Sequence, residues 1–144
     1  MSAEQDPLEA NKALVRRFWE AFSASRFADA LDLLHPDATW WVAGATDISG
    51  TYTKQQFSKL VTGIAEGTDG GIQVTPSNLT AEGDRVAMEA ESFGRLKNGK
   101  VYNNLYHFQH VMRDGKLVAI REYLDTQHVQ EIFGADASPP PANR

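Results

Sequence analysis

The chain contains no cysteine, and this absence removes several classes of site at once. Without thiols there is no disulfide, no thiolate zinc site and no cysteine nucleophile. Basic residues are also in the minority, because 14 Lys and Arg stand against 19 Asp and Glu, and they are scattered along the chain. Binding to phosphates requires clustered Lys and Arg. We therefore predict that nucleic acid is not a partner of this protein.

Long apolar runs are absent as well. No segment approaches the roughly 18 consecutive apolar residues that a membrane span needs. The first six residues, Met-Ser-Ala-Glu-Gln-Asp, are polar and acidic rather than typical of a signal peptide. We predict a cytoplasmic protein with no membrane contact. The 144 residues, 42% of them hydrophobic and 23% charged, fit an ordinary globular chain of one domain.

Recognisable cofactor and metal motifs are also missing. The glycine-rich segment 67–71 follows a predicted helix and precedes a predicted strand, which is the wrong order for a dinucleotide-binding turn. No Gly-x-Ser-x-Gly nucleophile motif occurs. His107 and His110 are three residues apart on a predicted strand, so they face opposite ways, which is poor geometry for a metal. We predict no cofactor and no metal.

The sequence contains segments of two kinds, one with the apolar spacing of helices and one with the β-forming residues of strands. Apolar residues at helical spacing predict helices over residues 7–24, 27–34, 54–65 and 126–133. Runs of β-forming residues predict strands over 38–43, 72–80, 85–96, 100–113 and 116–124, with a loop over 44–52. Thr53 and Gln56 form a capping box at the start of the third helix. Asn98-Gly99 and Asp114-Gly115 are strong hairpin turns.

This order of elements predicts an α+β fold, with a late antiparallel meander wrapped over early helices to form a cup open at one end. We place a single domain over residues 1–134. Residues 135–144 are Pro-rich and lack apolar anchors, so we predict a disordered tail.

One predicted strand carries the lining of a small-molecule pocket. Over residues 100–113 the larger, more aromatic face presents Tyr102, Asn104, Tyr106, Phe108 and His110, and we place this face inward. Apolar walls with a few polar groups are typical of ligand sites. The alternative is that the tyrosines only pack, with their hydroxyls at the rim.

Three carboxylates fall on faces that otherwise look apolar. Glu89 and Glu91 share a face with Phe93, and Glu122 shares a face with Ile120. We place all three in the cavity, where burial would raise their pKa values toward neutrality and suit them for proton transfer. Two alternatives stay open: a shift of one residue in face assignment would put them in solvent, and Glu122 could pair with an arginine. Asp125, at the start of the last helix, is more simply a helix cap.

Several segments resemble one known family. Residues 17–22 and 30–40 resemble the opening of the nuclear-transport-factor-2-like (NTF2-like) superfamily, and residues 106–108, 114–116 and 121–125 resemble its closing strands. The branch that the chain most resembles is the SnoaL-like, ketosteroid-isomerase-related group. The resemblance implies a cone-shaped α+β barrel, with a curved sheet wrapped around the N-terminal helices, and a homodimer. The superfamily includes isomerases, dehydratases, cyclases, epoxide hydrolases and binding domains, so the fold alone does not choose an activity.

Matching the family's functional positions to this chain narrows the choice. Steroid isomerases of this fold use a carboxylate base, a tyrosine and a protonated aspartate, and these positions fall on Val42, Phe18 and Tyr106, so true steroid-isomerase chemistry is not expected. The two acids and the arginine of limonene-epoxide-hydrolase-like members fall near Glu91, Glu122 and Glu89, without the arginine. In polyketide-cyclase-like members an acid/base carboxylate on the late strands resembles Glu122.

We therefore predict a cofactor-independent acid/base enzyme of isomerase, dehydratase or cyclase type that acts on a small hydrophobic substrate. Glu122, Glu91 and Tyr106 are the predicted catalytic residues. The predicted substrate-binding residues are Phe18, Trp40, Val42, Glu89, Asn104, Phe108, His110 and Ile120. The alternatives are an epoxide-hydrolase-like enzyme with a glutamate pair, or a non-catalytic binding and dimerisation domain. Apolar Leu105 and Val111, on the predicted outer sheet face, support a homodimer under either reading.

Overall fold

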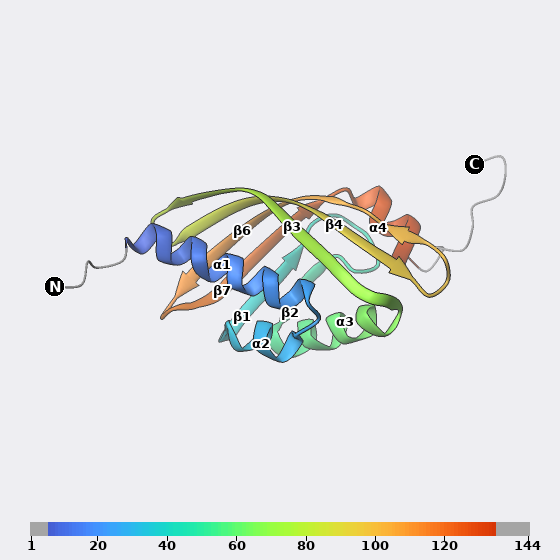
Figure 1. The fold of residues 1–144 in the computed structure, drawn as a ribbon, viewed down its shortest axis with the longest axis horizontal. Helices are drawn as coiled ribbons and strands as arrows, with labels where there is room; N and C mark the ends of the chain where they lie inside the picture. The colour runs from blue at the N-terminus through green and yellow to red at the C-terminus, as the bar shows by residue number, and fades with distance from the viewer. Residues whose placement is uncertain (1–5, 135–144) are drawn as a thin grey trace.

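The computed structural model describes residues 6–134, which form four helices and seven strands (Figure 1). The helices are α1 (Pro7–Ser23), α2 (Phe27–Asp32), α3 (Lys54–Glu66) and α4 (Thr126–Phe133). The strands are β1 (Leu34–Val42), β2 (Gly50–Thr53), β3 (Thr68–Glu82), β4 (Arg85–Leu96), β5 (Val101–Tyr102), β6 (Leu105–Arg113) and β7 (Lys116–Leu124). The predicted tail, residues 135–144, lies outside the described residues.

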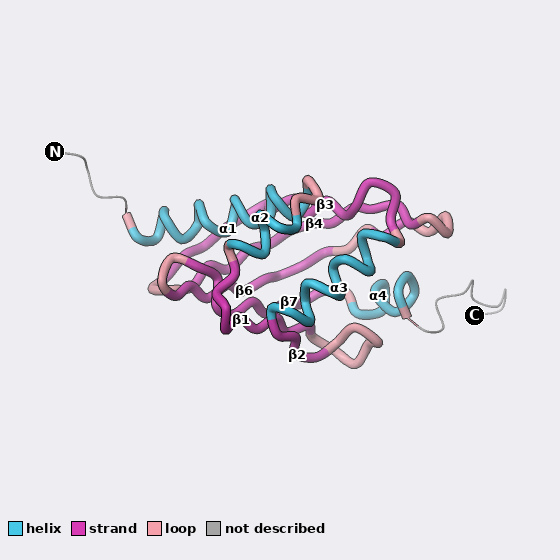
Figure 2. Tube along the Cα trace, turned by 90° about the horizontal axis from the view of Figure 1, so that it is seen from below, coloured by secondary structure: helices cyan, strands magenta, loops and turns pink. Residues whose placement is uncertain are grey.

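The strands form one mixed sheet that is not closed. Its order is β2-β1-β7-β6-β4-β3, with β5 paired to β4 beside this path. The pairing of β1 with β7 is parallel and the other pairings are antiparallel. Helices α1, α2 and α3 lie on one side of the curved sheet, and α4 lies at one end of it (Figures 1 and 2). The predicted α+β class is confirmed.

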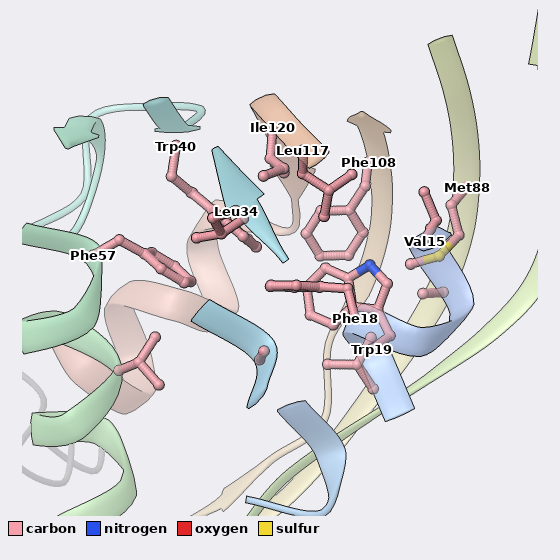
Figure 3. Packing of buried hydrophobic residues seen from close by; sticks show 14 of the residues in the cluster. Val15, Phe18, Trp19, Leu34, Trp40, Phe57, Met88, Phe108, Leu117 and Ile120 are labelled. Atoms are coloured by element: carbon pink, nitrogen blue, oxygen red, sulfur yellow. The ribbon is translucent and has the colours of Figure 1, made fainter. Parts of the chain in front are cut away.

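Aromatic side chains join the helices to the sheet. Phe18 and Trp19 project from α1 toward Phe108 of β6, and the Trp19 and Phe108 ring centroids are 4.6 Å apart (Figure 3). From α3, Phe57 stacks on Trp40 of β1 with centroids 3.9 Å apart. Aromatic pairs at such distances add stability beyond the area they bury. These contacts hold both helices against the concave face of the sheet.

Two predicted helix starts are confirmed in detail. Thr53 Oγ1 accepts the Gln56 N–H at 3.1 Å, while Gln56 Oε1 accepts the Thr53 N–H at 2.9 Å, which completes the capping box. At α4, Asp125 Oδ1 accepts the N–H groups of Gln127 and His128. Each bond satisfies a main-chain donor that a helix start leaves unpaired.

The strand boundaries differ from the prediction in several places. Strand β1 begins at Leu34, four residues before the predicted start at 38, and α2 ends at Asp32 rather than 34. Strand β2 lies inside the predicted 44–52 loop, because pairing with β1 organises a segment with little β pattern of its own. Strand β3 begins at Thr68 rather than 72, and Gly70 and Gly71 have positive φ values there. The predicted strand 100–113 is divided into β5 and β6 at Asn103–Asn104.

The face of β4 was predicted wrongly. Val86, Met88, Ala90 and Ser92 are buried on the concave side. Glu89 and Glu91 therefore lie exposed on the outer face with Phe93. The burial cost of two carboxylates exceeds the gain from burying one phenylalanine at the strand end.

In the part of the chain from residue 6 to residue 134, no helix is both long and apolar enough to cross a membrane.

Candidate active site

A cavity lies between α1, α3 and the concave face of the sheet. Its walls are mostly aromatic and aliphatic, and Glu122 is the one charged side chain among the described residues that line it. Its volume is about 70 Å³, well above the ~10–15 Å³ that one water needs. A mostly apolar lining with a few polar groups is typical of small-molecule pockets.

Glu122 enters the cavity from β7. Its Oε1 accepts a 2.8 Å hydrogen bond from the indole Nε1–H of Trp40, which lies on the neighbouring parallel strand β1. Burial raises the pKa of the Glu122 carboxyl to about 7, although the Trp40 bond opposes this shift. The side chain keeps some exposure, at the cavity that it lines. A carboxyl of this pKa can both accept and release a proton near neutral pH.

The arginine next to Glu122 in the chain does not neutralise it. The guanidinium of Arg121 lies on the outer face, 4.0 Å from the ring centroid of Trp41. Between residues 6 and 134, no salt bridge includes Glu122. The alternative of an arginine partner is therefore not what the structure shows, and Trp40 is the group that holds the carboxylate.

Two phenols, Tyr102 and Tyr106, lie on the wall with Glu122, and the hydroxyl of the buried Ser92 lies behind them. Tyr106 Oη lies 2.6 Å from Tyr102 Oη and 3.0 Å from Ser92 Oγ. Burial raises the pKa of Tyr102 to about 12 and that of Tyr106 well above its usual value, and the nearby Glu122 charge contributes to both shifts. Both phenols are therefore protonated at neutral pH and can donate hydrogen bonds to a ligand.

His110 is a structural residue. Its Nε2 accepts a 3.0 Å bond from Trp19 Nε1–H, so Nδ1 carries the proton and donates to the Val86 carbonyl at 3.0 Å. Burial lowers the pKa of His110 to about 4, which keeps the ring neutral. His110 thus joins α1 to β4 and β6 and does not line the cavity.

The predicted site residues fall into three groups. Those that line the cavity are Trp40, Val42, Tyr106, Phe108 and Glu122. Those buried behind its walls are Phe18, Asn104, His110 and Ile120. Those on the outer face are Glu89 and Glu91, where Asn78 and Asn103 donate to them. The predicted placement of these two glutamates in the cavity is wrong, and with it the predicted glutamate pair.

Several lining residues were not predicted as part of the site. Phe57, Leu60, Val61 and Ile64 come from one side of α3, and Phe133 comes from α4. Their helical spacing predicted a buried face but did not show that this face borders a cavity. Tyr102 lies on the predicted inward face and its hydroxyl adds a second phenol to the wall.

No group of three or more His, Cys, Asp or Glu side chains that could hold a metal ion occurs within the described range, residues 6–134.

The sequence profile of the SnoaL-like domain family matches residues 15–120. The chain belongs to this family. This assignment confirms the predicted NTF2-like, SnoaL-like relationship and agrees with the open, curved sheet over helices. No curated protein matches the sequence.

Solved structures share the fold of this SnoaL-like domain at low identity. A putative SnoaL-like polyketide cyclase from Jannaschia sp. CCS1 is 18% identical with a TM-score of 0.76, over 96% of this chain and all of the other. TerC, co-crystallised with polyporic acid, is 21% identical with a TM-score of 0.74, over 85% of this chain and 96% of the other. AclR, a putative hydroxylase from Streptomyces galilaeus, is 16% identical with a TM-score of 0.72, over 85% and 83%.

Proposed function

We propose that this SnoaL-like domain is a cofactor-independent acid/base enzyme, of isomerase, dehydratase or cyclase type, that acts on a small, apolar, uncharged substrate. The observation that carries the proposal is Glu122, an ionisable carboxyl in an aromatic cavity with a pKa raised to about 7. Perturbed carboxyls in clefts are typical of catalytic sites. A solved neighbour is described as a putative polyketide cyclase, and another was co-crystallised with a small organic molecule, polyporic acid, which supports a small-molecule substrate.

The residues divide the work by their chemistry. In our proposal Glu122 takes a proton from a carbon or hydroxyl of the substrate and later returns it. Tyr106 donates a hydrogen bond to the substrate oxygen on which negative charge develops. Trp40 holds the carboxylate in place through its 2.8 Å bond. The lining described here carries no Lys, Arg or His, so it offers nothing to neutralise an anionic substrate.

Two narrower activities lose support. The epoxide-hydrolase-like alternative needs a second acid near Glu122, and the two candidates, Glu89 and Glu91, lie on the outer face. Steroid-isomerase chemistry of the established kind needs acid/base and donor groups at positions that hold Val42 and Phe18, both apolar.

A non-catalytic binding domain is the second candidate. It is favoured by the same two apolar residues, Phe18 and Val42, and by a cavity whose lining is almost wholly apolar. In that case the cavity would hold a hydrophobic ligand without turning it over, and Glu122 would only accept a hydrogen bond.

We also propose that the outer sheet face joins two copies of the chain. Leu105 is 67% exposed there, and Phe93 and Tyr123 are each 42% exposed. Exposed large apolar side chains on one face of a sheet favour association with another protein surface. A homodimer is compatible with both candidate functions.

An NMR titration of the Glu122 carboxyl carbon tests the central observation without a known substrate. We expect a midpoint near 7, against about 4.3 for an unperturbed glutamate. A Glu122 midpoint below 5 would remove the basis for the acid/base role.

A further inference from the structure

The two phenols of the cavity wall and the serine hydroxyl behind them have one proton more than their mutual hydrogen bonds use. Ser92, Tyr106 and Tyr102 form a chain with two internal hydrogen bonds, of 3.0 and 2.6 Å. Each hydroxyl carries one proton, so two protons fill the internal bonds and one is left over. The direction of this remaining proton decides whether the hydroxyl chain can donate a hydrogen bond to a ligand in the cavity.

The amide of Asn104 lies at one end of this chain, and the main chain fixes its orientation. Its Oδ1 accepts from the N–H groups of Leu105 (2.8 Å) and Asp125 (3.2 Å), and its Nδ2 donates to the Asp125 carbonyl at 3.1 Å. Main-chain N–H groups only donate and carbonyls only accept, so a flipped amide would set donors against donors. The second Nδ2 proton is therefore directed at Tyr102 Oη, 3.0 Å away.

The main chain of the same residue fixes the other end. The Asn104 N–H donates to Ser92 Oγ at 3.1 Å. Ser92 is only 1% exposed, so its own proton needs a buried acceptor. Among the described residues, its other hydrogen-bond partner is Tyr106 Oη. The geometry of the Ser92–Tyr106 contact is that of a bond from Tyr106 Oη to Ser92 Oγ. That direction would leave the Ser92 proton unpaired, and an unpaired buried hydroxyl costs about 1–3 kcal/mol. We therefore assign the proton of this bond to Ser92.

We propose that Asn104 is a positioning residue that sets the direction of the hydroxyl chain, so that one proton of the Tyr102–Tyr106 pair is left to donate into the cavity. With Tyr102 accepting from Asn104 and Tyr106 accepting from Ser92, one phenol donates to the other, and both line the cavity. The inference rests on the proposed function, in which this wall polarises a substrate oxygen. It narrows the substrate: the atom at this wall is a hydrogen-bond acceptor, such as a carbonyl or enolate oxygen.

The same proton count makes the two phenols interchangeable as donors. In Tyr102→Phe, Ser92 still donates to Tyr106 and the Tyr106 proton is free for the ligand. In Tyr106→Phe, the Tyr102 proton is free instead. Only the double variant removes the donor. A site in which Tyr106 alone donates would lose it in the single Tyr106→Phe variant.

Asn104→Asp tests the positioning role directly. The Asn104 amide donates two protons, one to Tyr102 Oη and one to the Asp125 carbonyl, whereas an aspartic acid at this position has at most one. That proton goes to the Asp125 carbonyl, which can only accept, so nothing is left to donate to Tyr102. Tyr102 then donates to position 104, Tyr106 donates to Tyr102, and Ser92 donates to Tyr106. All three hydroxyl protons are used, and none faces the cavity.

Neutron diffraction from deuterium-exchanged crystals of the protein reads these positions with no ligand present. We expect the Ser92 deuterium on the line to Tyr106 Oη, both Asn104 amide deuteriums directed at Tyr102 Oη and the Asp125 carbonyl, and one phenol deuterium facing the cavity. A Ser92 deuterium directed away from Tyr106, or a Tyr102 deuterium directed at Asn104, would overturn the proposal.

In solution, the probe is acetophenone labelled with ¹³C at the carbonyl, and the readout is its infrared C=O stretch. We expect a shift to lower frequency in the wild type, Tyr102→Phe and Tyr106→Phe, and loss of the shift in Asn104→Asp and in the double phenylalanine variant. A folded Asn104→Asp with the wild-type frequency, loss of the shift in Tyr106→Phe alone, or a wild type that leaves acetophenone unbound or unshifted would contradict the inference.

The readout separates this inference from the proposed function. Glu122→Gln should keep the acetophenone shift, because Glu122 is not part of the hydroxyl chain. If the shift persists while Glu122 proves irrelevant to turnover, the acid/base proposal fails and the hydroxyl chain stands. If Asn104→Asp does not fold, by circular dichroism, the two single phenol variants and the double variant still decide the outcome.

Discussion

At the scale of single residues, environment separates glutamates that the sequence makes look alike. Glu122 and Glu91 both lie on central strands of the sheet, and each shares a strand face with an apolar residue, Ile120 for Glu122 and Phe93 for Glu91. Glu122 lines an aromatic cavity and has a pKa of about 7. Glu91 is exposed on the other face, where Asn103 Nδ2 donates to it at 2.9 Å. Desolvation, rather than residue type, makes one of them a candidate for proton transfer.

Replacing Glu122 by Gln keeps the size of the side chain and removes its proton chemistry. We expect kcat on an identified substrate to fall by about 10²–10⁴-fold, the usual contribution of a general acid or base. Steady-state kinetics measure this fall in kcat, and circular dichroism checks that the variant is folded. Glu91→Gln is the matched change on the outer face and should stay near wild type. Equal rates for Glu122→Gln and wild type would show that Glu122 is not the acid/base group.

The sequence allowed the inward face of β6 to be predicted correctly, because four large or aromatic side chains alternate with smaller ones. It failed for β4, where the residues that fill the concave side are Val86, Met88, Ala90 and Ser92, none of them aromatic. The aromatic side chain of Phe93 caused the face that carries Glu89 and Glu91 to be placed inward. The burial cost of carboxylates was the stronger signal, since unpaired charges are rarely buried. The polar wall needed the structure, because hydrogen bonds between strands do not follow from periodicity.

At the scale of elements, α4 closes one end of the cavity. Phe133 of this helix lines the cavity, and its ring centroid lies 4.8 Å from that of Tyr102. The His128 ring of α4 stacks on the same Tyr102, with ring centroids 5.3 Å apart, and its Nε2 accepts the Asn103 N–H. The helix is only eight residues long, so its position depends on its cap and these contacts.

Removing the cap of α4 should loosen this end of the cavity. We expect Asp125→Ala to lower the free energy of unfolding by about 1 kcal/mol and to speed amide exchange along α4. Denaturant unfolding and hydrogen exchange measure the two effects. Asp6→Ala, which removes the N-cap of α1, is the matched control, because it should cost a similar amount without faster exchange in α4. Unchanged exchange in α4 of Asp125→Ala would show that packing alone holds the helix.

The predicted elements were most accurate where local chemistry decides the structure. The capping box at Thr53 and the hairpin turns Asn98-Gly99 and Asp114-Gly115 depend on neighbours in sequence. Strand β2 and the first residues of β3 depend on partners far along the chain, so they carry little local signal. The parallel pairing of β1 with β7 belongs to the same class.

At the scale of the whole molecule, two buried groups titrate in opposite senses. Glu122 has its pKa raised from 4.5 to about 7, so its contribution to stability is full below pH 4.5 and is lost as the pH rises to about 7. His110 has its pKa lowered from 6.5 to about 4, so its contribution is full above pH 6.5 and is lost as the pH falls to about 4. Each slope is about 1.4 kcal/mol per pH unit at most.

Between pH 4.5 and 6.5 the two slopes cancel, so we expect the unfolding free energy of the wild type to be nearly flat there. Glu122→Gln removes one of them, and its stability should rise with pH over this range because the His110 contribution is then unopposed. Urea unfolding at several pH values measures both curves. Glu91→Gln should keep the flat curve. A flat curve for Glu122→Gln would show that burial does not lower the pKa of His110 in the folded state.

The outer face provides a prediction on assembly. Leu105→Glu places a charge at the most exposed large apolar residue of that face, and we expect it to shift the protein from dimer to monomer in sedimentation at micromolar concentration. Gln55→Glu adds the same charge on exposed α3 and should leave assembly unchanged. A monomeric wild type, or a Leu105→Glu protein that stays dimeric, would contradict the proposed interface.

The parallel pairing of β1 with β7 has a consequence for synthesis on the ribosome. Trp40 and Glu122 are 82 residues apart in the chain, so the indole emerges long before the carboxyl that it will hold. Until β7 emerges, β1 and β6 each lack the strand that lies between them, and unpaired strand edges favour association with other chains. Contacts of this sequence separation form slowly. The cavity is therefore completed near the end of translation of the domain. A nascent chain that stalls before β7 has a cavity without Glu122 and exposed edges on β1 and β6.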